Sequence, residues 1–208
     1  AVPPVTVDAL PDINWVAKSL EGLAPIETDR FFVHGAHDAA KCPSARIPLL
    51  VDAGEAFGTG HHGTTLACLK FIEKECQRRT PGRVLDLGCG TGLLAIAAAK
   101  LTGRQVIASD IDPIATRVTR ENARANKVPL IKTITTKGTD HPDLKAHGPY
   151  DLLIANILAR PLAQIAPDIE HQLTRGGTLI LSGILHEQEQ MVLSAYRDQG
   201  LYLLDRLR

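Results

Sequence analysis

The feature that most constrains the fold of this chain is a glycine-rich turn at residues 86–92, whose sequence is DLGCGTG. It follows a short apolar run that ends at Leu85 and precedes an apolar, alanine-rich run that begins at Leu93. A strand that leads through a glycine-rich turn into a helix is typical of nucleotide-binding α/β folds. Glycine permits a tight turn and lets a ligand approach where a Cβ would block it. The turn therefore predicts an α/β fold with a nucleotide-type ligand beside it.

From residue 64 onward, apolar runs of strand length alternate with helical patterns. This alternation predicts a doubly wound, mostly parallel sheet with helices on both faces. A helix is expected from residue 64, before the first of these strands. The strands are expected over 83–88, 105–111, 130–135, 150–156, 178–184 and 201–208, and the later helices over 92–101, 113–126, 160–173 and 187–199.

The first fifty residues have a different texture, with prolines scattered among short apolar runs. We interpret residues 1–50 as an N-terminal extension or linker region and residues 51–208 as the main domain. A short helix is expected over 12–20, and two short strands are expected over 31–33 and 47–51 as a small antiparallel pair. Prolines place such strands at sheet edges.

Two acidic residues identify the ligand more closely. The glycine pattern is G-x-G-x-G, and Asp86 would repel the pyrophosphate of a dinucleotide but would suit a cationic amino group. Asp110 follows Gly88 by 22 residues, at the end of the next strand, where a carboxylate can accept both ribose hydroxyls. We therefore expect S-adenosylmethionine, bound by Asp86, Gly88, Gly90, Gly92 and Asp110. A nicotinamide-dependent dehydrogenase shares this fold but is disfavoured by the same two features.

Composition argues against several other classes of protein. Lys and Arg together number 23, as do Asp and Glu, so the net charge is zero and no broad nucleic-acid surface is expected. No apolar stretch approaches the roughly 18 residues of a membrane span. The four cysteines form no C-x-x-C pair, which indicates reduced thiols in a cytoplasmic protein. The histidine pairs lack a second ligand pair at zinc spacing, so no metal is expected.

Asn156 ends the fourth predicted strand, where its amide oxygen could accept an N–H from an incoming amine. The backbone carbonyl of Ile157 could accept a second one, and two acceptors would aim the nitrogen lone pair at the methyl group. The alternative is that Asn156 caps the following helix. No aromatic residue follows Asn156 in Ile157-Leu158-Ala159, where enzymes that methylate planar nitrogens carry one, which favours a flexible aliphatic amine such as a lysine side chain or a protein N-terminus.

Three stretches resemble the PrmA family, the methyltransferases of ribosomal protein L11. They are residues 54–65 (GEAFGTGHHGTT), residues 84–92 together with 108–113, and residues 155–159 (ANILA) followed by 181–185 (LSGIL). The resemblance implies that Thr65, Gly88, Asp110 and Asn156 contact S-adenosylmethionine. It also implies that Phe57 and the loop 58–60 close over the cofactor. Phe57 could line the channel for the target, and the alternative is a core aromatic residue of the linker region. Gly63 stands where the family usually has proline.

The resemblance implies a Rossmann-like methyltransferase with a sheet of the seven-stranded type, here lacking the last strand. It implies transfer of methyl groups from S-adenosylmethionine to lysine or N-terminal amines of a large-subunit ribosomal protein. The alternatives are a methyltransferase for another protein lysine or a small-molecule amine, and a non-catalytic S-adenosylmethionine-binding subunit. We expect a monomer with no direct nucleic-acid or membrane partner. Residues 1–30 are too short for the small domain with which family members grip their substrate.

Overall fold

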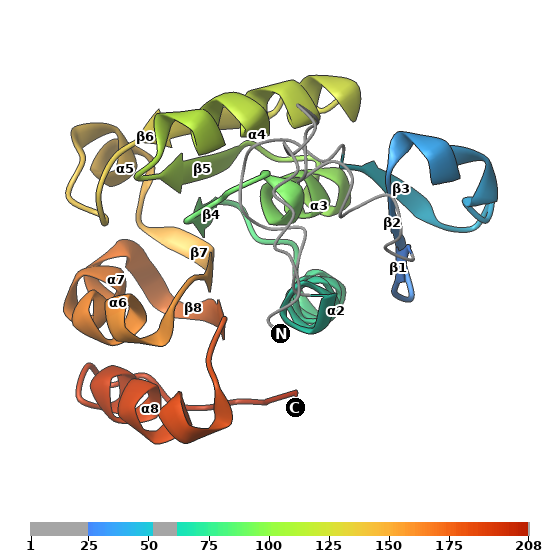
Figure 1. The fold of residues 1–208 in the computed structure, drawn as a ribbon. Helices are drawn as coiled ribbons and strands as arrows, with labels where there is room; N and C mark the ends of the chain where they lie inside the picture. The colour runs from blue at the N-terminus through green and yellow to red at the C-terminus, as the bar shows by residue number, and fades with distance from the viewer. Residues whose placement is uncertain (1–24, 52–61, 208) are drawn as a thin grey trace, which may run out of the picture.

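The computed structural model describes residues 25–51 and 62–207 (Figure 1). Its centre is a five-stranded sheet in the order β6-β5-β4-β7-β8, and every neighbouring pair in it is parallel. Strand order runs outward from β4 in both directions, which confirms the predicted doubly wound fold. The strands are β4 (Val84–Leu87), β5 (Val106–Asp110), β6 (Ile131–Thr135), β7 (Tyr150–Asn156) and β8 (Leu173–Ser182).

Helices cover both faces of this sheet. Most strand residues are apolar because successive side chains alternate between two buried faces. Val84 and Leu152 join one core with the first three helices, whereas Leu85 and Leu153 join a second core with the last four. The first three helices are α2 (His62–Arg78), α3 (Leu93–Thr102) and α4 (Pro113–Ala125). The last four are α5 (Pro142–His147), α6 (Ala159–Gln164), α7 (Ala166–Gln172) and α8 (Glu189–Arg197). A 3-10 turn over His186–Gln188 precedes α8.

Two predicted elements have different boundaries in the structure. The helix expected over 160–173 is interrupted, because α6 ends at Gln164 and α7 begins at Ala166. Pro167 lies in the first turn of α7, where its missing N–H and its ring prevent the preceding helix from continuing through it. The last strand of the sheet begins at residue 173, not 178, with an irregularity in its pairing to β7 near Leu152.

The strand predicted over 201–208 is wrong for residues 201–207, which form no sheet pairing. The side chains of Tyr202 and Leu204 are more than four-fifths exposed. Asp205 instead forms an ion pair with Lys74 of α2, and Arg206 forms one with Glu189 of α8. An apolar run has strand propensity, but a strand exists only where a neighbour supplies the ladder of hydrogen bonds.

The segment before the main sheet forms a separate small sheet in the order β1-β2-β3, drawn in blue in Figure 1 well apart from α6, α7 and α8. Its strands are β1 (Ile26–Glu27), β2 (Phe31–His34) and β3 (Ile47–Leu50). The expected antiparallel pairing of the two longer strands is wrong: β2 and β3 are parallel, because a 3-10 helix over Ala36–Lys41 carries the chain back between them. Pro48 lies on an edge strand as predicted, whereas β2 is central.

This small sheet packs against the main domain through polar and apolar contacts. Glu73 of α2 accepts hydrogen bonds from the Thr28 hydroxyl and from the backbone N–H of Arg30, the latter at 2.9 Å. Phe31 and Leu49 are fully buried in the same core as α2 and α3. The division of the chain near residue 50 remains a prediction, and the helix expected over 12–20 lies outside the described residues.

Candidate cofactor and amine site

The glycine-rich turn between β4 and α3 adopts a backbone that only glycine accommodates readily. Gly88, Gly90 and Gly92 have φ values of +75°, +52° and +78°, in the left-handed region. The N–H of Gly88 donates to the carbonyl of Ser109 in β5 at 2.7 Å. A Cβ on Gly92 would lie 2.6 Å from Cγ2 of Thr119 in α4, so that glycine also permits close packing. The turn is therefore a backbone cradle fixed between β4, β5 and α4.

Asp110, at the end of β5, is held against this cradle. Its Oδ2 atom accepts the N–H of Gly90 at 3.0 Å, and its Oδ1 atom accepts the N–H of Asp112 at 3.0 Å. Each carboxylate oxygen retains further acceptor capacity. The structure thus brings Asp110 and the glycine turn together, as the spacing in the sequence predicted, with its carboxylate oriented by two backbone donors.

Asp86 lies beneath the cradle, on the face of β4 that packs against α3. Its side chain is buried, and Oδ2 accepts the N–H of Ala95 at 3.0 Å. Burial raises the pKa of the Asp86 carboxyl to about 7, with a smaller contribution from the negative charge of Asp110. Its Oδ1 atom is buried without a hydrogen-bond partner. A buried acceptor of this kind needs a donor, and the ammonium of a methionine moiety is chemically suited to supply one.

Asn156 ends β7, and Asn156 and Ile157 lie between the cradle and the end of β8. A Cβ on Gly88 would lie 2.3 Å from Cγ2 of Ile157. On the other side, a Cβ on Gly183 would lie 2.5 Å from the carbonyl oxygen of Ile157 and 3.4 Å from Oδ1 of Asn156. Asn156 is not the N-cap of α6, because that position is Leu158. The two proposed amine acceptors therefore both lie close to Gly183, and the Ile157 side chain lies against the glycine turn.

The start of α2 reaches the same end of the sheet. Thr65 is buried in the first turn of α2, and the carbonyl of Thr64 accepts a hydrogen bond from the Ser182 hydroxyl at the end of β8, at 3.4 Å. Phe57 and the loop 58–60 lie outside the described residues. No role was predicted for Gly183 from the sequence, although a glycine within a predicted strand signals close approach of another backbone.

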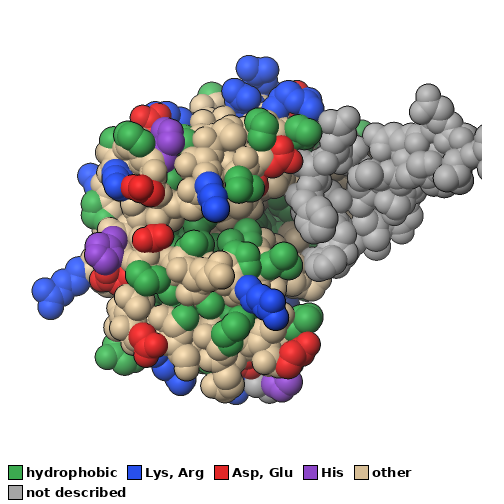
Figure 2. All heavy atoms as spheres, turned by 60° about the vertical axis from the view of Figure 1, so that its left-hand side comes forward, with side chains coloured by type: hydrophobic (Ala, Val, Ile, Leu, Met, Phe, Trp, Pro, Cys, Tyr) green, Lys and Arg blue, Asp and Glu red, His purple; other side chains and the backbone are tan. Residues whose placement is uncertain are grey.

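Exposed apolar side chains surround this end of the sheet. Ile111, Leu158 and Leu185 follow β5, β7 and β8, and their exposed fractions are 64%, 75% and 59%. Figure 2 shows apolar side chains gathered near the centre of one face, whereas the Lys and Arg side chains are interspersed with Asp and Glu. An apolar rim around a few polar acceptors is typical of sites that bind small organic ligands.

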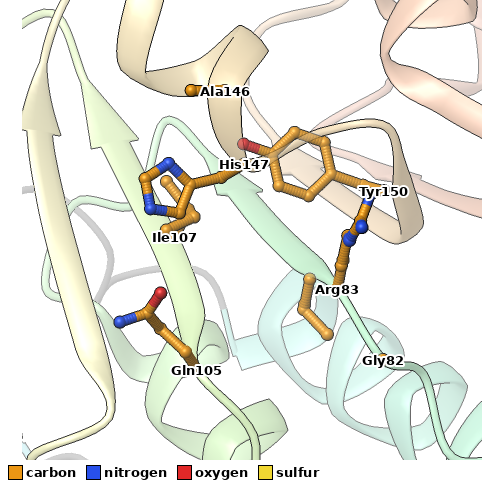
Figure 3. A pocket seen from close by; sticks show the side chains of 8 residues that line it. Gly82, Arg83, Gln105, Ile107, Ala146, His147 and Tyr150 are labelled. Atoms are coloured by element: carbon orange, nitrogen blue, oxygen red, sulfur yellow. The ribbon is translucent and has the colours of Figure 1, made fainter.

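A cavity of about 250 Å³ lies at the opposite, amino edge of the sheet (Figure 3). It is lined by the starts of β4, β5 and β7 and by the end of α5. Two of its polar groups already have partners: Nη1 of Arg83 donates to the carbonyl of Gly148 at 3.0 Å, and the Tyr150 hydroxyl donates to the carbonyl of Leu144 at 2.9 Å. The cavity is therefore distant from the glycine turn and offers few unpaired groups to a ligand.

The described residues, 25–51 and 62–207, contain neither a helix that could span a membrane nor a cluster of metal ligands. No helix there is both long and apolar enough to cross a membrane. Within the same ranges, no three His, Cys, Asp or Glu side chains come together as metal ligands. The four cysteines are all free thiols, and two of them, Cys68 and Cys89, are buried. Burial raises the pKa of the Cys68 thiol to about 12, so it carries no thiolate nucleophile at neutral pH.

Comparison with known proteins gives a consistent result. The profile of the family described as ribosomal protein L11 methyltransferase (PrmA) matches residues 2–207. The chain is 52% identical to the ribosomal protein L11 methyltransferase of Mesorhizobium japonicum over 95% of this chain and 68% of that protein. It is 51% identical to the protein of the same name from Rhizobium meliloti, with the same coverage.

Solved structures agree with the sequence comparison. The crystal structure of a ribosomal protein L11 methylase from Lactobacillus delbrueckii subsp. bulgaricus superposes with a TM-score of 0.79 at 28% identity, covering 89% of this chain and 93% of that chain. A precorrin-6y C5,15-methyltransferase from Geobacter metallireducens has a TM-score of 0.55 at 14% identity over 64% of this chain and 70% of that one, and thus shares the fold alone. Because the family profile covers residues 2–207 and relatives of that name are 51–52% identical over most of the chain, this chain belongs to the ribosomal protein L11 methyltransferase family, whose members are S-adenosylmethionine-dependent enzymes.

Proposed function

We propose that this enzyme transfers methyl groups from S-adenosylmethionine to amino groups of ribosomal protein L11, on lysine side chains, on the N-terminal amine or on both. The observation that carries the proposal is that two acceptors, Asn156 Oδ1 and the Ile157 carbonyl, lie close together beside Gly183, while the Ile157 side chain lies against the glycine cradle. The names of the relatives that match most of this chain supply the substrate.

Several of the described residues would hold different parts of the cofactor. The backbone of Gly88, Gly90 and Gly92 lets the cofactor approach closely, and Asp110 accepts the ribose hydroxyls. Asp86 would accept its ammonium, because Oδ1 is buried without a partner. Thr65, at the start of α2, would donate to its carboxylate. The bound cofactor supplies a methyl group already activated on a sulfonium, so the protein has mainly to position groups and to exclude water.

The amine is oriented by this chain. A neutral amine that donates one N–H to Asn156 Oδ1 and another to the Ile157 carbonyl has its lone pair directed away from both. Leu158 is 75% exposed at this point, and an aliphatic side chain there suits the stem of a lysine better than a planar ring. Phe57, outside the described residues, is proposed to line the same channel.

The proposal is tested by incubating the protein with labelled S-adenosylmethionine and purified, unmethylated ribosomal protein L11, followed by mass analysis of its peptides. Label on lysine or N-terminal amines supports the proposal. Label only on other proteins or on a small-molecule amine would favour a different acceptor. Cofactor binding without any transfer would indicate a non-catalytic subunit. The proposal also includes action in the cytoplasm as a monomer, without direct contact to nucleic acid, which gel filtration and RNA-binding measurements can check.

A further inference from the structure

Gly183, directly after β8, occupies a position where a residue with a Cβ would fit only if the backbone moved. Its φ is +79°, and a Cβ there would lie 2.5 Å from the carbonyl oxygen and 3.1 Å from the carbonyl carbon of Ile157. Both atoms belong to the backbone, so rotation of a side chain cannot relieve the conflict. Real carbon atoms do not approach an oxygen this closely, and ordinary contact would require the Ile157 carbonyl to move by about 1 Å.

Ile157 is also confined from the other side. A Cβ on Gly88, in the cofactor cradle, would lie 2.3 Å from Cγ2 of Ile157 but 3.8 Å from its Cβ. Ile157 therefore lies between two left-handed glycines, its side chain against Gly88 and its carbonyl against Gly183. The two contacts differ in kind, since one involves a side-chain methyl and the other the main chain.

A Cβ on Gly183 would also approach the second proposed amine acceptor. It lies 3.4 Å from Oδ1 of Asn156 as well as 2.5 Å from the Ile157 carbonyl oxygen. Hydrogen bonds of the N–H···O type need donor and acceptor between about 2.7 and 3.2 Å apart. A displacement of the carbonyl by about 1 Å would therefore break one of the two bonds to the amine.

We propose that Gly183 is a positioning residue for methyl transfer, because the absence of a Cβ lets the Ile157 carbonyl and Asn156 Oδ1 face the amine together. The inference rests on the proposed function. Gly183 needs neither contact with the cofactor nor contact with the substrate for this role. It acts through the backbone of Ile157. The distance between the two acceptors, which lie at the end of β7, therefore also depends on the position of the residue after β8.

The test compares Gly183→Ala with Gly200→Ala. Gly200 has nearly the same φ, +77°, but a Cβ there meets nothing within 4 Å, so it carries the same backbone strain without the steric conflict. Both variants are assayed for kcat and KM with ribosomal protein L11, for S-adenosylhomocysteine affinity by calorimetry and for Tm. Gly183→Ala should lower kcat about 10²-fold, as a 1 Å misplacement does. Its affinity for S-adenosylhomocysteine should stay within about threefold of wild type, as expected where no cofactor contact is lost.

Three results would overturn the inference: equal kcat in the two variants, a parallel loss of S-adenosylhomocysteine affinity in Gly183→Ala, or an unfolded Gly183→Ala beside a folded Gly200→Ala. The last would assign Gly183 to folding alone. A wild-type protein that binds S-adenosylhomocysteine but never methylates ribosomal protein L11 would instead reject the proposed function, so the two failures are distinct.

A second comparison tests the geometry itself. Ile157→Ala removes Cγ2, so it should restore part of the S-adenosylhomocysteine affinity that Gly88→Ala loses. The same change leaves the Ile157 carbonyl in place and should restore nothing to the kcat of Gly183→Ala. If Ile157→Ala rescues Gly183→Ala, the side chain and not the carbonyl is what Gly183 accommodates, and the inference is wrong.

Discussion

The two edges of the main sheet use polar groups in opposite ways. At the amino edge, His147 Nδ1 contacts the Asp143 carbonyl at 2.7 Å, and Asp151 Oδ2 accepts the N–H groups of Gly82 and Arg83, each at 2.9 Å. At the carboxyl edge, Oδ1 of Asp86 is buried with no partner. The first edge satisfies its hydrogen-bonding groups internally, whereas the second leaves some of them open.

This difference indicates where the protein binds its ligands. A buried polar group without a partner costs about 1–3 kcal/mol, so it is retained where a ligand or a bound water supplies the missing bond. The cavity at the amino edge has a measurable volume but few unpaired polar groups, because Arg83 and Tyr150 donate their hydrogen bonds to backbone carbonyls of the protein. Unpaired polarity is therefore a better guide to the site in this fold than cavity volume. Four predictions test the contrast between the edges, the largest effect first.

The largest effect is expected in the pH dependence of the unfolding free energy of the unliganded protein. Burial raises the pKa of Asp86 to about 7 from an ordinary value of 3.8, so the carboxyl stabilises the fold while protonated. That contribution is fully present below the ordinary value and is lost as the pH rises through about 7. Relative to Asp86→Asn, the wild type should lose about 3 kcal/mol of unfolding free energy between pH 5 and pH 8. Urea unfolding at a series of pH values measures it, and parallel curves for both proteins would contradict it.

The second effect concerns turnover. Asn156→Ala removes one of the two amine acceptors and should lower kcat about 10²-fold, because a misaligned amine is rarely in position to react. Affinity for S-adenosylhomocysteine should change far less. Single-turnover kinetics and calorimetry separate the two. Lost affinity with normal turnover would assign Asn156 to the methionine moiety of the cofactor.

The third prediction compares two aspartates that each accept backbone N–H groups, one at either edge. Asp110→Ala should weaken S-adenosylhomocysteine binding by about 1–3 kcal/mol, since the ribose hydroxyls lose a charged acceptor and Gly90 loses its own. Asp151→Ala should lower Tm without changing that affinity. Equal losses of affinity in the two variants would show that Asp110 acts only through folding.

The smallest effect is expected at Gln105, an exposed residue on the rim of the amino-edge cavity. Gln105→Ala should change the unfolding free energy by no more than about 0.5 kcal/mol, as exposed substitutions usually do. It should leave kcat and KM unchanged. A marked loss of activity would mean that the amino edge takes part in function after all, and would break the contrast drawn above.

Features that depend on neighbours along the chain were predictable. The glycine turn, the carboxylate that follows Gly88 by 22 residues and the alternation of strand and helix predicted the doubly wound sheet and the meeting of Gly90 with Asp110. The ends of helices and the direction of strand pairing were less predictable. The interruption before Pro167 had a local cause that the helical pattern concealed, and the parallel pairing of β2 with β3 depended on the path of a short connection.

By itself, the sequence determined the class of fold and the chemistry of the cofactor cradle, because each of these follows from residue types at short spacings. Only the tertiary structure decided that residues 201–207 join no sheet and that Asp86 is buried with one oxygen unpaired. It also decided that Gly88 and Gly183 confine Ile157 from two sides. Such contacts join segments far apart in the chain, and close packing fixes them to within an ångström, which no pattern along the sequence records.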